Sequence, residues 1–100
     1  MTNITIKQNG KHVVVKADNH ADRSDICTSV STLLCTLDGA IRNNEDAVCW
    51  YSDLKPGRSR IEFLAAGELA MEDLRMAVIG FLQLQESFPD SVKVDQNIFS

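Results

Sequence analysis

The chain opens with two short segments in which apolar and polar residues alternate. Residues 4–7 and 12–17 have this period of two, and the dipeptide Asn-Gly at 9–10 lies between them. Because Asn-Gly is a preferred loop of tight hairpins, the pattern predicts two antiparallel strands. A loop at these two residues places Ile6 opposite Val13. Four apolar residues then share one face of the pair: Ile4, Ile6, Val13 and Val15.

The next segment has the period of an amphipathic helix. Its apolar residues recur three or four positions apart and form one stripe: Ile26, Val30, Leu33, Leu34, Leu37 and Ile41. Ser24 or Asp25 is expected to cap the first turn, and the two asparagines at 43–44 to end the helix. Asp38 and Arg42 are spaced for an ion pair on its surface.

A second hairpin and a second helix follow. Residues 47–52 and 60–65 are predicted strands, and Lys-Pro-Gly-Arg at 55–58 fits a type II turn between them. Helical spacing returns in a second apolar stripe: Ala70, Leu74, Ala77, Val78, Phe81 and Leu84. Pro89 ends this helix, and residues 92–94 are predicted to form a short last strand.

The predicted order is therefore ββαββαβ. Hairpins in place of parallel crossovers favour an α+β fold, with both helices packed on one face of an antiparallel or mixed sheet. The chain has 100 residues, of which 44% are hydrophobic, so one domain over residues 1–100 can build its own core and disorder is excluded. No apolar run is long enough for a membrane span or a signal peptide, and we expect a cytoplasmic protein.

Charge and cysteine content narrow the function classes. The net charge of −4 argues against a nucleic-acid binder and suits a neutral or basic partner. The three cysteines form no CxxC pair, which favours neither a disulfide framework nor a zinc site, and we expect no metal or cofactor. Cys35 and Cys49 lie in periodic apolar segments and are predicted to be core or strand residues.

Several other polar and aromatic residues are explained by folding alone. His12 is predicted to be an exposed strand residue. A basic turn carries Lys55, Arg58 and Arg60, which are either solvated or in contact with an acidic partner. Trp50 and Tyr51 are neighbours in a strand and point to opposite faces, so at most one joins the core. The other is available to line a groove or a dimer contact.

Residues 18–27 are where chemistry is expected. His20 ends a strand and Cys27 enters the first turns of a helix, where unpaired N–H groups and the helix dipole favour an anion. A thiol and an imidazole are the minimum for thiol acyl transfer, with the thiolate attacking a carbonyl and the imidazole handling the proton. The alternative is a solvated histidine and a packed cysteine.

This segment resembles the ribosomal-processing cysteine protease family, Prp. The family pattern is a strand ending in Gly-His-Ala, a loop, and an Asp-Ile-Val-Cys-like entry into a helix with serine four residues later. The sequence has Asn-His-Ala at 19–21 and Ser-Asp-Ile-Cys-Thr-Ser-Val-Ser at 24–31. The direct matches are His20, Ala21, Cys27 and Ser31. Element order and the Phe-Pro-Asp ending of the second helix at 88–90 extend the resemblance along nearly the whole chain.

The resemblance implies a cysteine endopeptidase with Cys27 as nucleophile and His20 as general base. Ser31, Asp25 and Asn19 are then the supporting residues. By this resemblance, members of the family are homodimers. They trim a short N-terminal extension, after an aromatic pair, from a ribosomal protein or a phage structural protein. The resemblance therefore implies a protein or peptide substrate, a homodimer, and a divergent, phage-borne member of the family.

The departures from the family pattern support a second interpretation. Asn19 stands where the family has glycine, Ser24 stands where the family has an acidic residue, and the loop from His20 to Cys27 is shorter and lacks glycine. A short loop closes less readily over a peptide. A catalytically inactive, dimeric binding module is therefore the alternative to the enzyme, and a structural protein of a larger assembly is a third possibility.

Overall fold

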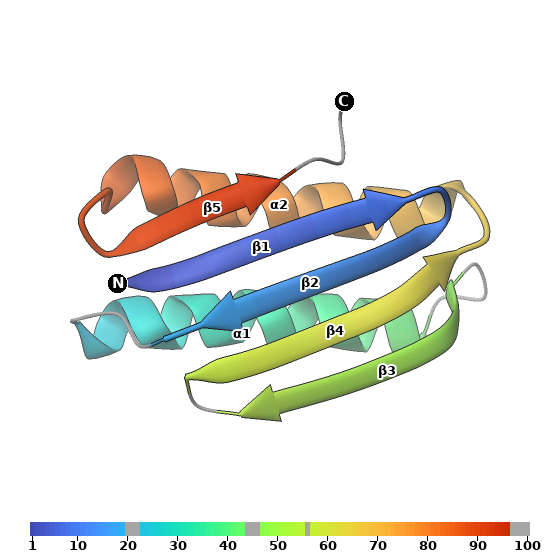
Figure 1. Cartoon of the computed structure of the whole chain (residues 1–100), viewed down its shortest axis with the longest axis horizontal. Coiled ribbons are helices and arrows are strands. Elements are labelled where there is room, and N and C mark those ends of the chain that lie inside the picture. The colour runs from blue at the N-terminus through green and yellow to red at the C-terminus, as the bar shows by residue number, and fades with distance from the viewer. Residues whose placement is uncertain (20–22, 44–46, 56, 97–100) are drawn as a thin grey trace.

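Five strands and two helices follow one another in the predicted order (Figure 1). The structure, a computed structural model, describes residues 1–19, 23–43, 47–55 and 57–96. The elements are β1 (Thr2–Asn9), β2 (His12–Asp18), α1 (Ser24–Arg42), β3 (Ala47–Lys55), β4 (Arg58–Ala65), α2 (Glu68–Ser87) and β5 (Val92–Gln96).

The strands form one mixed sheet in the order β3-β4-β2-β1-β5. β1 and β5 run parallel, and the other neighbours are antiparallel. Both helices cover the same face, and the opposite face carries no helix in the described part of the chain (Figure 1). The predicted α+β fold with two helices on one face is confirmed.

The core lies between the sheet and the two helices. Strand residues alternate between this core and the open face, as the period of two requires. The largest fully buried side chains are Phe63, Phe81, Ile4, Ile6, Ile26, Leu37, Ile41, Ile61, Leu74, Val13, Val15 and Val78. Each helix contributes one apolar stripe to this core, and neither α1 nor α2, within the residues that the structure describes, has the apolar length to cross a bilayer.

The register of the first hairpin differs from the prediction by two residues. Asn9 pairs with His12 and Ile6 with Val15, so Gly10 and Lys11 form the loop. Gly10 has φ 63°, the positive value that a type II′ turn requires at its first central residue. Because a shift of two preserves the side-chain alternation, the four predicted apolar residues still share the buried face.

The second hairpin has the predicted turn, but its strands are longer than predicted. Lys55 pairs with Arg58, and Gly57 has φ 74°, as the third position of a type II turn requires. Pro56 lies outside the described residues. The end of β3 and the start of β4 lie at the same end of the sheet as the start of α1 (Figure 1).

The pairing of β3 with β4 shifts at a β-bulge between Val48 and Tyr51, and the two aromatic residues of β3 point to opposite faces of the sheet there. Trp50 is 39% exposed and donates its indole N–H to Asp38 of α1, at 2.9 Å. Tyr51 pairs with Glu62 of β4, lies on the open face of the sheet and is 53% exposed. Neither residue is fully buried, and Trp50 takes the helix side because the bulge turns its ring toward α1.

Candidate functional site

Cys27 lies in the first turns of α1, where the resemblance places a nucleophile. Its side chain is partly buried at the edge of the core. Its N–H donates the first helical hydrogen bond to the carbonyl oxygen of Arg23, at 3.2 Å. The positive end of the helix dipole therefore faces this region of the molecule.

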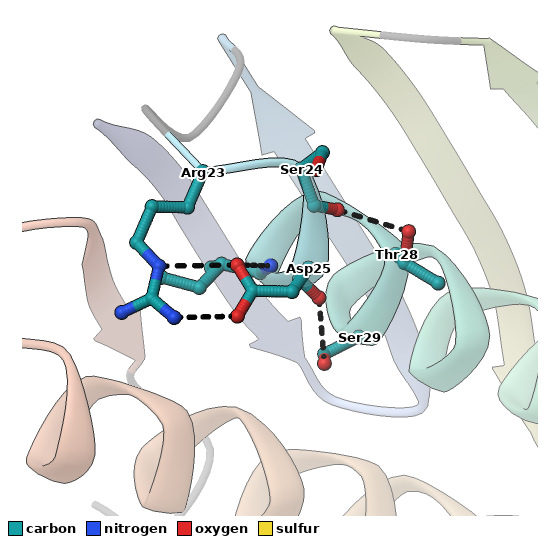
Figure 2. Close-up of polar contacts among 6 residues, drawn as sticks. Arg23, Ser24, Asp25, Thr28 and Ser29 are labelled. Atoms are coloured by element: carbon teal, nitrogen blue, oxygen red, sulfur yellow. Dashed lines mark hydrogen bonds and ion pairs between the residues drawn. The ribbon is translucent and has the colours of Figure 1, made fainter.

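An ion pair between Arg23 and Asp25 organises the start of α1 (Figure 2). The guanidinium donates to both carboxylate oxygens, with the shorter contact at 2.6 Å, and Asp25 also accepts the N–H of Ile26 at 3.0 Å. The predicted cap at Ser24 or Asp25 is wrong, because α1 already begins at Ser24 and Arg23 takes the N-cap position. Asp25 instead binds an N–H from within the first turn, and Arg23 neutralises its charge.

Arg23 also links the start of α1 to the end of α2. Its guanidinium lies over the ring of Phe88, 5.3 Å from the centroid. Phe88 is the C-cap of α2, which confirms that this helix ends before Pro89. The contact joins the residue before α1 to the residue after α2, two segments that are far apart in the sequence.

Asn19, directly after β2, has an unusual backbone conformation. It is the one non-glycine residue with positive φ in the described ranges, at 69°. Its N–H donates to the carbonyl of Gly57 at 2.9 Å, and its own carbonyl accepts the hydroxyl of Thr2 at 3.3 Å. Asparagine thus takes the left-handed backbone that glycine adopts most freely. The bond to Gly57 ties the end of β2 to the β3–β4 turn.

His20 follows directly, and it lies outside the described residues together with Ala21 and Asp22. The chain's other histidine, His12, starts β2 at the end opposite to Asn19 and is exposed, as predicted. Its Nε2 lies 2.8 Å from a carboxylate oxygen of Glu62, whose other oxygen accepts a bond from Arg60 at 2.8 Å. Hydrogen bonds from Arg60 and then from His12 hold the pKa of Glu62 below its ordinary value of 4.5.

A cleft of about 270 Å³ opens beside Cys27, between α1 and the end of the sheet. One wall is a single face of α1, with Cys27, Ser31 and Cys35 at intervals of four residues. The opposite wall is the β3–β4 turn with Lys55 and Arg58. Apolar residues form much of the lining: Ala17, Val30, Leu34 and Leu54. The cleft therefore combines a largely apolar lining with a thiol from α1 and residues of the β3–β4 hairpin.

Ser31 and Cys35 differ from the residues around them. Four hydroxyls of α1 (Thr28, Ser29, Thr32 and Thr36) donate to the carbonyl four residues earlier. The hydroxyl of Ser31 forms no hydrogen bond within the described ranges and is exposed at the cleft. The prediction of Cys35 as a core residue is wrong, because it is exposed and the adjacent Leu34 takes the core position. The side chain of Cys49 lies outside the described part of the chain.

Sequence reasoning missed the contribution of the β3–β4 turn to the cleft. The residues of the turn are plain in the sequence, but no local pattern indicates that they line the same cleft as Cys27. The position of this turn beside the cleft depends on the pairing of β4 with β2 and on the hydrogen bond from the N–H of Asn19 to the carbonyl of Gly57. Asp18 pairs with Arg58 where β2 ends, and this pairing of β2 with β4 is a long-range contact that no sequence pattern indicates.

Comparison with known proteins establishes the fold. No family model matches the chain, and no curated protein does. The essential ribosomal processing protease Prp from S. aureus, solved with a covalently linked product peptide, has a TM-score of 0.82 at 18% identity, over 97% of this chain and 100% of that one. The same protease with a substrate peptide gives 0.81 at 17% identity, with the same coverage. SMU.848 from Streptococcus mutans gives 0.73 at 20%, over 96% and 93%. The chain thus has a Prp-like fold.

Proposed function

We propose that the chain is a cysteine endopeptidase in which Cys27 is the nucleophile and His20 the general base. The observation that carries the proposal is the position of Cys27 at the wall of an open cleft, in the first turns of α1. The fold is that of a protease solved with a covalently linked product peptide. A thiol in such a position is accessible to a peptide and lies at the positive end of a helix.

In the proposed reaction, His20 takes the proton of the Cys27 thiol, and the thiolate attacks the carbonyl carbon of the peptide bond. The tetrahedral intermediate collapses when the imidazolium gives the proton to the leaving amine, which leaves a thioester on Cys27. Water, deprotonated by the same imidazole, then hydrolyses the thioester. The N–H groups of Ile26 and Cys27 are already bonded to Asp25 and Arg23, so the oxyanion requires other donors.

Asn19 and Ser31 are proposed as positioning residues. Asn19 sets the direction of the chain into His20 through its left-handed backbone and its bond to Gly57. Ser31 lines the cleft one turn beyond Cys27, and its hydroxyl, which no described residue binds, is available to a peptide or to the imidazole. Asp25 keeps Arg23 in place, so its effect on Cys27 is indirect.

The proposed substrate is the N-terminal extension of a ribosomal or phage structural protein. The structural relative from S. aureus is a ribosomal processing protease with peptide complexes, and a cleft next to a thiol suits an extended peptide. The homodimer that the resemblance implies and the location in the cytoplasm stay predictions.

A peptide library derived from a bacterial proteome tests the enzyme without the choice of a single substrate. The purified chain is incubated with the library, and new N-termini are identified by mass spectrometry. Cys27→Ala should lower cleavage by a factor of about 10³ or more, and His20→Ala by about 10² or more. Cys35→Ala removes a second thiol from the same wall, and it should keep cleavage within a few-fold.

Two results would contradict the proposal. Cleavage by Cys27→Ala at the wild-type rate would exclude Cys27 as nucleophile. Peptides that bind to the wild-type chain and to Cys27→Ala equally, without any cleavage, would identify the inactive binding module instead.

A further inference from the structure

The two border strands of the sheet differ in whether their outward backbone groups are already bonded. Figure 1 shows β3 at one border and β5 at the other. In β5, the N–H of Val92 donates to the carbonyl of Phe88 at 3.0 Å. The N–H of Val94 donates to Oε1 of Gln85 at 2.6 Å. A side chain of α2 and the C-cap of the same helix therefore close this edge against another strand.

The register of the sheet determines which backbone groups of β3 point outward. The N–H of Ala65 donates to the carbonyl of Lys11 at 2.8 Å, so the odd-numbered residues of β4 bond to β2. The even-numbered residues of β4 bond to β3, where their partners are Tyr51, Asp53 and Lys55. Ser52 and Leu54, which lie between these partners, direct their N–H and C=O groups away from the sheet.

The outward groups of β3 are open where those of β5 are closed. Within residues 1–19, 23–43, 47–55 and 57–96, no hydrogen bond reaches the outward N–H and C=O groups of Ser52 and Leu54. The bulge between Val48 and Tyr51 confines the regular part of this edge to residues 51–55. A regular edge with unbonded donors and acceptors is the surface to which an extended peptide adds as a further strand.

This edge meets the cleft at Leu54. The partly buried side chain of Leu54 lines the cleft together with Cys27 and Ser31, while its backbone groups face outward. The end of β3 and the start of α1 also lie at the same end of the sheet (Figure 1). A strand paired with β3 has alternate side chains on the α1 side of the sheet, next to Leu54. Its backbone therefore runs beside the cleft that contains the thiol.

We propose that β3 binds the substrate as an added strand, and that the backbone groups of Ser52 and Leu54 pair with an extended peptide whose next residues enter the cleft beside Cys27. This binding mode rests on the proposed endopeptidase function. The two residues offer two donors and two acceptors, which align the peptide but do not distinguish side chains. The substrate class is therefore a segment that is unfolded before it binds, and the cleft supplies any preference for particular side chains.

Methylation of the peptide backbone tests the pairing with the wild-type chain. The probe is the library peptide that is cleaved fastest, resynthesised with one backbone nitrogen methylated at a time, outside the two residues that flank the cleaved bond. A methyl group removes one donor and blocks close approach of the β3 edge. It should lower kcat/KM about fivefold or more at every second position beside β3, and less than about twofold at the positions between. Losses without this period of two would contradict the pairing.

Ser52→Pro removes the matching donor from the protein. The N–H of Ser52 points away from β4, so an edge strand accepts proline there without loss of a sheet hydrogen bond. The variant should lower kcat/KM about tenfold, because the ring also blocks the edge. Ser52→Ala keeps the N–H and should stay within about twofold of the wild type. If Ser52→Pro does not fold, the methylation series decides, because it uses the wild-type chain.

The remaining outcomes separate this binding mode from the proposed enzyme. Cys27-dependent cleavage that is insensitive to both changes would overturn the β3 site and leave the endopeptidase intact. If no cleavage depends on Cys27, the proposed function fails, and the methylation series is repeated on library peptides retained by immobilised Cys27→Ala, with binding as the readout. Retention with a period of two would still support the β3 site, and no retention would overturn it. A dimer that Ser52→Pro converts to a monomer would show that a second copy occupies the edge, which would also overturn it.

Discussion

The two ends of helix α1 carry the same pair of residue types and use them differently. At the C-terminal end, Asp38 is buried and accepts both the indole N–H of Trp50, at 2.9 Å, and Nε of Arg42, at 3.2 Å. Arg42 in turn lies over the ring of Trp50, 4.1 Å from its centroid. At the N-terminal end, both side chains of the Arg23–Asp25 pair are more than half exposed.

This difference separates stability from chemistry along one helix. At the C-terminal end the polar groups satisfy one another and fasten the edge strand β3 to α1, so they have little capacity to bind a ligand. At the N-terminal end the thiol of Cys27 and the hydroxyl of Ser31 face an open cleft. We therefore expect substitutions at the C-terminal end to change stability, and substitutions at the N-terminal end to change reactivity.

Trp50→Ala should have the largest effect on stability. It removes a hydrogen bond to a buried carboxylate, a cation–π contact and part of the packing between β3 and α1, at a total cost of about 2–3 kcal/mol in the free energy of unfolding. Tyr51→Ala is the matched control, because the next residue is exposed on the other face and should cost less than about 1 kcal/mol. Urea denaturation measures both, and equal costs would show that Trp50 does not fasten β3.

Asn19→Ala tests the loop next to the cleft. Alanine at a φ of 69° is strained, so the substitution should cost about 1 kcal/mol in the free energy of unfolding. Asn19→Gly keeps the backbone conformation and should be close to neutral, while both variants retain the bond from residue 19 to Gly57. Thermal denaturation compares the two. A stable alanine variant would show that the left-handed backbone is not required for folding.

The fold could be predicted from the sequence because its determinants are local. The alternation of apolar and polar residues predicted the strands, and an apolar period near 3.6 residues predicted the helices. Glycine marked both tight turns. The register of the first hairpin was wrong because Asn9-Gly10 and Gly10-Lys11 are both acceptable loops. The two loops give strand pairings that differ by two residues, and the same apolar residues face the core in either register.

The site could be predicted only in part. The position of Cys27 follows from the helical period, and the left-handed Asn19 from its place in the resemblance. The exposure of Cys35 and the contribution of the β3–β4 hairpin to the cleft depend on how α1 lies across the sheet, which no single segment encodes. His20 lies outside the described residues, so its role stays a prediction.

Removal of one charge at each end of α1 compares the ends directly. Asp25→Asn should cost about 0.5 kcal/mol, because an exposed pair at a helix N-terminus contributes little. Asp38→Asn should cost more, since its side chain is only 12% exposed and holds two donors. The comparison is made by urea denaturation in low and high salt. Salt should reduce the effect at Asp25 more than that at Asp38, and an equal reduction would contradict the difference in burial.

The smallest expected effect is the pH dependence from Glu62, which belongs to neither end of α1. Because hydrogen bonds from Arg60 and His12 lower the folded-state pKa of Glu62 below 4.5, the carboxylate stabilises the fold above that pH. This contribution is lost as the pH falls from about 4.5 through the lower folded-state pKa, and it amounts to less than about 1 kcal/mol. Glu62→Gln should therefore flatten the acid limb of unfolding free energy against pH and leave the shape of the curve near neutral pH unchanged. If the limb is unchanged in Glu62→Gln, the acid sensitivity belongs to other carboxylates, and Asp25 and Asp38 are the first pair to compare by the same measurement.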